Sequence, residues 1–88
     1  MKTIWKFEIV SMDNGIWMPK GAEVLSVGSQ GSALFFWAIV DPKAEKELRR
    51  FGFSGTGHPV PDGIKKFLGT VQQIPPFVWH CFELEVKP

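Results

Sequence analysis

The chain has 88 residues and a formal net charge of +1; 44% of its residues are hydrophobic, 22% charged and 14% aromatic. This composition excludes a disordered protein, and the length fits one domain, residues 1–88. The near-neutral charge argues against a duplex-DNA binder. A lone cysteine, Cys81, excludes an intrachain disulfide and a multi-cysteine metal site.

Two strands are predicted at the start of the chain. Residues 3–11 alternate apolar and polar side chains, a pattern typical of a half-buried strand. Asn14-Gly15 is a hairpin signal, so residues 16–21 are expected to return as a short strand beside the first. Pro19 cannot donate a hydrogen bond to a sheet, which predicts an edge position for this second strand.

The middle of the chain predicts two more strands and a polar segment. Residues 22–28 and 33–40 are strand candidates joined by a turn at 29–32. The stretch 33–40 is expected to be a central strand because both of its faces are apolar. Residues 41–50 form a polar run, for which a single helical turn and a charged loop are equal alternatives.

The C-terminal part predicts three strands, at residues 50–55, 68–74 and 77–86, with an irregular loop at 56–67. Six or seven short strands with frequent turn signals favour an all-β, mainly antiparallel fold, either a sandwich or a small open barrel. Consecutive strands are expected to pair with each other.

The stretch GFSGTGHPVPDG, residues 52–63, contains four of the nine glycines. It fails the dinucleotide-binding fingerprint, because Val60 stands where the third glycine is needed and no helix follows. Backbone N–H groups and side-chain donors in this loop are instead expected to bind an anion. The alternative is a tight turn in which glycine only supplies a positive φ. The candidate ligand-binding residues of the loop are Gly55, Thr56, Gly57 and His58.

Basic residues flank this loop. Arg49 and Arg50 precede it, and Lys65 and Lys66 follow it. Because guanidinium groups suit phosphate and carboxylate ligands, we expect these four residues and His58 to form a cationic rim around residues 55–58. The alternative is a solvated charged turn.

Trp17 and Trp79 are the aromatic candidates. Trp17 lies on the predicted edge strand, and Trp79 shares a strand face with Cys81 and two glutamates, opposite an apolar row. An aromatic ring on a polar face suits stacking on a base or contact with another subunit. Packing in the core is the alternative for both tryptophans.

No motif predicts catalysis, a metal or a cofactor. His80 and Cys81 point to opposite faces of one strand, so they cannot ligate one metal together. No local pattern joins the cysteine to a histidine as nucleophile and base. We therefore expect no enzymatic activity, no metal and no cofactor. The N-terminus has no signal-peptide pattern, and no apolar run reaches the ~18 residues of a membrane helix.

The blocks MPKGAEVLSVGSQ, GTGHPVPD, FLGTVQ and FVWHCFE, in this order over nearly the whole chain, resemble a family of small phage-encoded proteins. The resemblance implies a protein made in the host cytoplasm, in keeping with the lone cysteine.

By class-level analogy with phage proteins that sequester nucleotide immune signals, we expect a non-enzymatic, homo-oligomeric anti-defence protein, or sponge. Its ligand would be a small anionic nucleotide, such as a cyclic nucleotide or an ADP-ribose derivative, held at subunit interfaces. The alternative is a protein–protein interaction module, either an inhibitor of a host protein or a virion accessory protein. Binding of nucleic acid ranks third.

Overall fold

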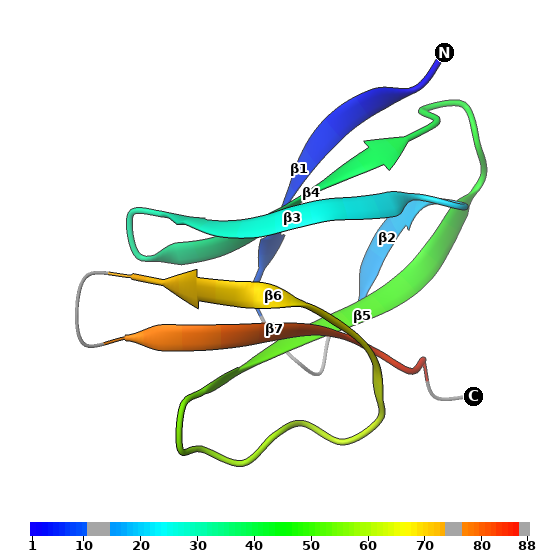
Figure 1. The fold of residues 1–88 in the computed structure, drawn as a ribbon. Helices are drawn as coiled ribbons and strands as arrows, with labels where there is room; N and C mark the ends of the chain where they lie inside the picture. Colours follow the sequence, from blue (N-terminus) through cyan, green and yellow to red (C-terminus); the bar gives the residue numbers. More distant parts are fainter. Residues whose placement is uncertain (11–14, 74–76, 87–88) are drawn as a thin grey trace.

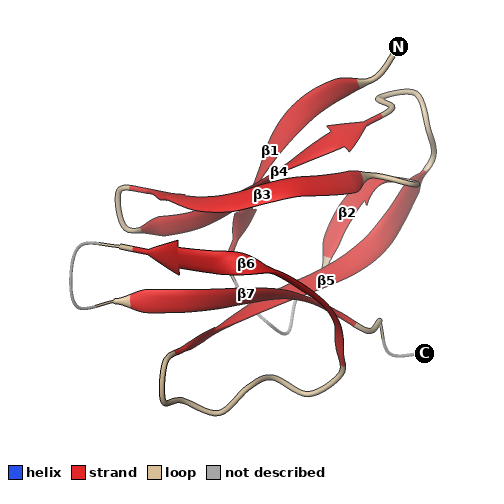
Figure 2. Cartoon of the chain, in the orientation of Figure 1, coloured by secondary structure: helices blue, strands red, loops and turns tan. Residues whose placement is uncertain are grey.

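The computed structural model describes residues 1–10, 15–73 and 77–86, all of which are strands, turns or loops (Figures 1 and 2). In this described part of the chain no helix could cross a membrane. The strands are β1 (Thr3–Ile9), β2 (Ile16–Pro19), β3 (Glu23–Gln30), β4 (Ala33–Val40), β5 (Lys46–Gly55), β6 (Ile64–Gln72) and β7 (Val78–Leu84).

The seven strands form two antiparallel sheets that pack as an open sandwich (Figure 1). One sheet has the order β1-β4-β3 and the other the order β2-β5-β7-β6. The sheets approach each other closely where β3 lies beside β6: a Cβ added at Gly69 would lie 2.8 Å from Cγ2 of Val27. The predicted all-β, mainly antiparallel fold is confirmed, as a sandwich that does not close into a barrel.

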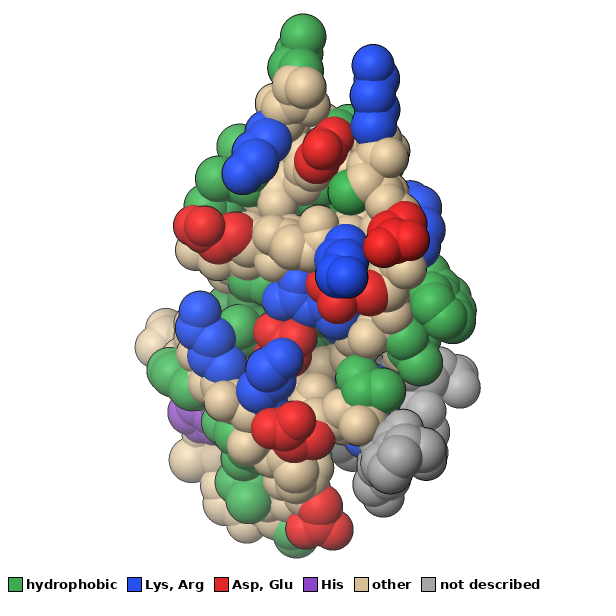
Figure 3. All heavy atoms as spheres, turned by 90° about the vertical axis from the view of Figure 1, so that its right-hand side faces the viewer, with side chains coloured by type: hydrophobic (Ala, Val, Ile, Leu, Met, Phe, Trp, Pro, Cys, Tyr) green, Lys and Arg blue, Asp and Glu red, His purple; other side chains and the backbone are tan. Residues whose placement is uncertain are grey.

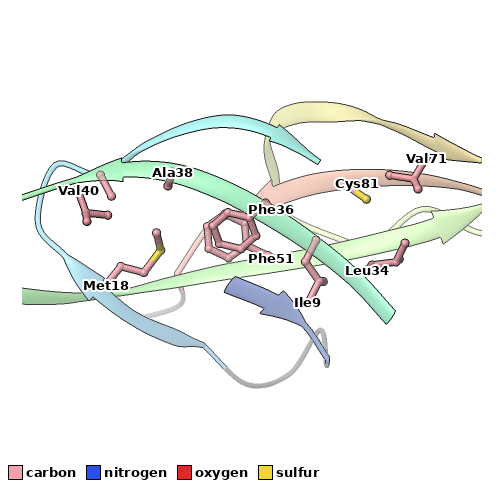
Figure 4. Close-up of a cluster of buried hydrophobic side chains, with 10 residues drawn as sticks. Ile9, Met18, Leu34, Phe36, Ala38, Val40, Phe51, Val71 and Cys81 are labelled. Atoms are coloured by element: carbon pink, nitrogen blue, oxygen red, sulfur yellow. The ribbon is translucent and has the colours of Figure 1, made fainter. Parts of the chain in front are cut away.

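The core lies between the two sheets (Figure 4). Phe36 of β4 packs against Phe51 of β5 with 4.3 Å between ring centroids, and the fully buried Met18 of β2 belongs to the same cluster. Side chains of β4 alternate between buried and half-buried, so both faces of this strand are apolar. The central position predicted for residues 33–40 is confirmed, because β4 lies between β1 and β3.

The expected pairing of consecutive strands is confirmed for β3–β4 and β6–β7, and it is wrong for the other pairs. β1 pairs with β4 and β2 pairs with β5, so the predicted β1–β2 hairpin is wrong; Asn14, which suggested it, lies outside the described residues. The chain changes sheets between β1 and β2, and the buried side chains of Ile9 and Met18 therefore reach the core from opposite sheets. The edge position predicted for β2 from Pro19 is confirmed.

The polar run at 41–50 is neither a helical turn nor simply a loop. Residues 41–45 form a turn in which Asp41 accepts hydrogen bonds from the N–H groups of Lys43 and Ala44. Residues 46–50 instead begin β5, where they pair with β2 and β7. Residues 46–49 pair with β2, and the pairing with β7 begins at Arg50; this backbone pairing overrides the polar composition here. The strand β6 likewise begins at Ile64, inside the segment predicted to be a loop.

Candidate functional site

One hollow brings half of the predicted ligand-binding residues together. It has a volume of about 390 Å³ and lies where β5 ends and β7 begins. Its lining residues are Gly55, Thr56, His58, Phe77, Val78 and Trp79. We call it the aromatic hollow. Gly57 belongs to the same turn, between two lining residues. The sequence reasoning missed Phe77 and Val78, although Phe77 precedes Trp79 by two residues in an alternating strand, which places both on one face.

Two stacked rings form the wall of the aromatic hollow. Phe77 and Trp79 lie 6.1 Å apart at ring centroids with an interplanar angle of 7°. The Trp79 indole N–H donates to Oε1 of Gln73 at 2.8 Å, and Phe53 packs edge-on against the indole ring. The Trp79 ring is therefore held in one orientation, whereas Phe77 remains 54% exposed to solvent.

For Trp79 the sequence left two alternatives, a ring on a polar face that could stack on a base and packing in the core, and the structure shows core packing. The other residues on the same face of β7, Cys81 and Glu83, are both buried in the sandwich, and the Trp79 ring packs against the core cluster. The inward face tolerates Glu83 because the carboxylate meets the guanidinium of Arg49 there. Trp79 also lines the hollow, so this ring packs against the core and contributes to the wall of the hollow.

The glycine-rich turn uses its backbone donors internally. The N–H of Thr56 donates to the carbonyl of Val78 at 3.3 Å, and the N–H of His58 donates to the carbonyl of Gly55 at 3.0 Å. Gly57 has a φ of 87°, which favours glycine. These features match the tight-turn alternative and remove two donors that an anion-binding loop would need.

Side chains hold this turn onto the outer face of the four-stranded sheet. The hydroxyl of Ser54 donates to the carbonyl of Pro59 at 2.9 Å. The ring of His80 lies between two hydroxyls, with Nε2 at 2.8 Å from Thr56 Oγ1 and Nδ1 at 3.1 Å from Thr70 Oγ1. His80 therefore ties the start of the turn to β6 and fixes one side of the hollow.

The expected cationic rim around residues 55–58 does not form. Arg50 pairs in register with Leu84, whereas Gly55 pairs with Trp79, so the two lie five residues, or about 17 Å, apart along β5. The loop after Gly55 runs back along the sheet, which places Lys66 beside Glu83 and away from the hollow. Basic and acidic side chains are interspersed on the face shown in Figure 3.

Arg49 and Arg50 make different contacts. Arg49 lies on the inner face of β5, where it binds the carboxylate of Glu83 and the carbonyl of Ala22. The hydrogen bonds to Glu83 raise the pKa of Arg49, against the opposing effect of burial. Arg50 lies on the outer face and donates to the carbonyl of Glu85. The structure therefore places neither guanidinium in the hollow.

Trp17, the remaining predicted site residue, is 65% exposed on the edge strand β2. It pairs in register with Leu48 and does not line the aromatic hollow. A second hollow, of about 270 Å³, shares Trp79 with the first and includes Glu8, Phe53 and Gln73. Trp79 thus separates two hollows at the same end of the sandwich.

The described residues offer little reactive chemistry. Among them, no three His, Cys, Asp or Glu side chains are grouped so that they could hold a metal ion. Cys81 is fully buried, and burial raises the pKa of its thiol to about 11. The thiol is therefore protonated at neutral pH, which is unsuitable for a nucleophile.

Fold and hollow together define a small antiparallel β-sandwich with an aromatic-walled hollow at one end. Residues 1–88 match the family described as "Domain of unknown function (DUF7352)", and the chain belongs to this family. Comparison with curated proteins and with solved structures finds no match to the chain.

Proposed function

We propose that the protein is a non-enzymatic binding protein that takes the base of a small nucleotide-type ligand in the aromatic hollow. The observation that supports this most strongly is the convergence of the glycine turn with Phe77 and Trp79 around about 390 Å³. This volume falls within the usual range of ligand pockets, about 300–1,000 Å³.

The lining favours a planar ring with hydrogen-bonding edges. Phe77 is the more exposed of the two stacked rings, so a base can stack on it or insert at its edge. Thr56 and His58 supply polar groups beside the rings. Among the residues that the structure describes, none that lines the hollow is a lysine or arginine, so the phosphates of the ligand would point toward solvent rather than into the hollow.

The choice of a nucleotide signal and of sequestration without cleavage rests on the resemblance to phage-encoded proteins. A sponge needs only affinity, and a stacked base with few polar contacts is sufficient for that purpose. In this proposal the protein acts in the host cytoplasm against a nucleotide-based defence.

Thermal shift and calorimetry with bases, nucleosides, mononucleotides, cyclic oligonucleotides and ADP-ribose derivatives test the proposal. A ligand at 100 times its dissociation constant should stabilise the protein by about 2.7 kcal/mol, and it should be recovered unchanged. If the base is the recognised part, a nucleoside and its monophosphate should bind within a few-fold of each other. Absence of any stabilisation across the panel would contradict the proposal.

Matched variants test whether the ligand binds in the aromatic hollow. Phe77→Ala should weaken binding at least ten-fold, whereas Phe67→Ala should not, because the two rings are equally exposed (54% and 55%) but only Phe77 lines the hollow. Gly55→Ala should also weaken binding, since the new methyl group would lie 3.3 Å from the Trp79 ring and 3.4 Å from His58 Nδ1. Equal losses in Phe77→Ala and Phe67→Ala would place the ligand elsewhere.

The exposure of Trp17 supports a second candidate, a protein–protein interaction module. Exposed tryptophans are frequent hot spots of interfaces, and Trp17 is 65% exposed on an edge strand. In this case the wild-type protein should capture a host protein in a pull-down. The Trp17→Ala variant should no longer capture it, whereas the Phe67→Ala variant should.

A further inference from the structure

The outer face of the three-stranded sheet has a row of large apolar side chains. Phe35, Trp37 and Ile39 project from β4 away from the core and are only half-buried. The outer face of an antiparallel sandwich is normally polar, and apolar surface of this kind marks an interaction site. Ile4 and Leu25, from the strands on either side, are 56% and 46% exposed. We call Phe35, Trp37 and Ile39 the outer row.

Opposite charges lie beside the outer row on β1. Lys6 pairs in register with Trp37, and Glu8 pairs in register with Phe35. The ammonium group of Lys6 lies 4.6 Å from the centroid of the Phe35 ring and donates to Gln30 at 2.8 Å. A positive and a negative side chain thus stand two residues apart along the edge of the apolar row.

This arrangement complements itself under a two-fold rotation. Consider an axis in the plane of the interface, perpendicular to the strands, at the level of Phe36. The rotation places Lys6 opposite Glu8 of the partner subunit and Phe35 opposite Trp37 of the partner subunit, and each contact occurs twice. Gly28 pairs in register with Phe35, and Ser26 with Trp37, so small residues would meet over β3.

We propose that a second copy of this chain packs face to face on the outer row, forming a two-fold symmetric dimer. Charge complementarity and a shared apolar row are what an isologous interface requires. The face of a three-stranded sheet buries an area at the lower end of the range for stable protein–protein interfaces. The dimer is therefore expected to dissociate on dilution. The outer row lies on the three-stranded sheet and the aromatic hollow on the four-stranded sheet, so the proposal is independent of ligand binding.

Sedimentation over a concentration series, with a charge-reversal cycle, tests the dimer. Lys6→Glu and Glu8→Lys should each raise the dissociation constant about ten-fold, because each places like charges opposite one another twice. The double variant Lys6→Glu/Glu8→Lys should dimerise like the wild type. An equimolar mixture of the two single variants should form a heterodimer, which a local structural defect would not produce.

A substitution within the outer row provides a second test of the dimer. Ile39→Thr should weaken the dimer, whereas Ile64→Thr, on the exposed part of β6, should leave it unchanged. Circular dichroism and thermal unfolding verify that both variants fold. The proposal is overturned if the wild type stays monomeric at every concentration. It is also overturned if its dimer is insensitive to both charge reversals.

Discussion

Arg49 and Glu83 form a two-point ion pair inside the sandwich. Nε and Nη2 of Arg49 each lie 2.8 Å from an oxygen of the Glu83 carboxylate. The side chains are 14% and 6% exposed, and the residues are 34 positions apart in the chain. This pair joins β5 to β7 on the inner face of the four-stranded sheet, where two isolated charges would be strongly destabilising.

Replacing one member of the pair should be costly. Glu83→Leu removes the carboxylate that makes both hydrogen bonds to the buried Arg49 cation, so the free energy of unfolding should fall by about 3–5 kcal/mol. Glu85→Leu, at the exposed position two residues further on, should change it by less than about 0.5 kcal/mol. Urea titration measures both. The double variant Arg49→Met/Glu83→Leu should recover most of the loss, and equal effects at positions 83 and 85 would refute the buried pair.

The contact between β3 and β6 should make Gly69 intolerant of larger side chains. Gly69 has a φ of 152°, and a Cβ there would lie 2.8 Å from Cγ2 of Val27. Gly69→Ala should therefore lower the free energy of unfolding by about 1–3 kcal/mol. Val27→Ala should relieve part of that loss in the double variant, and strictly additive effects in this double-mutant cycle would argue against the contact.

The thiol of Cys81 should make the stability fall at alkaline pH. Burial raises its pKa from 9.0 to about 11, so between these values the unfolded chain loses the proton while the folded state keeps it. The unfolded state then binds fewer protons, and the free energy of unfolding decreases as pH rises from about 9 to 11. Urea midpoints over this range should decline in the wild type more steeply than in Cys81→Val.

Thiol labelling checks the same burial independently. In the native protein the disulfide reagent DTNB should react with Cys81 far more slowly than in denaturant, because the side chain is fully buried. Fast labelling of the folded protein at neutral pH would contradict the predicted inaccessibility.

Ser54 should control the aromatic hollow without controlling the fold. Its hydroxyl holds the glycine turn through the carbonyl of Pro59, and a hydrogen bond of this kind contributes about 1 kcal/mol. Ser54→Ala should increase proteolytic cleavage within residues 56–63 and weaken ligand binding, with a small change in melting temperature. Ser26→Ala, at an exposed position of β3, is the control and should leave both properties unchanged.

Local sequence patterns predicted correctly those features that depend on a few neighbouring residues. The strand at residues 33–40 was predicted with its observed bounds, because a continuous apolar stretch is enclosed by turn residues on both sides. The edge position of β2 followed from Pro19, because proline has no N–H to donate to a neighbouring strand, whichever strand that is. The position of Gly55, Thr56, His58 and Trp79 around one hollow was also anticipated in part.

The failures share one cause, which is pairing between distant residues. Arg49 looked like a ligand for phosphate, and Glu83 marked its face of β7 as the polar one, because each charge was judged without the other. The prediction of a cationic rim was wrong for a similar reason. Arg50 and His58 are close in sequence, but the extended strand β5 separates them in space.

Taken alone, the sequence determined the all-β class and the approximate places of six or seven strands, because alternation and turn chemistry act over a few residues. Only the tertiary structure decided which strands pair and which face of β7 is internal. It also decided that the glycine turn meets aromatic rings rather than guanidinium groups. These outcomes depend on partners such as Glu83 for Arg49, 34 residues away, and no local pattern encodes the free energy of a contact that forms only when distant strands such as β5 and β7 come together.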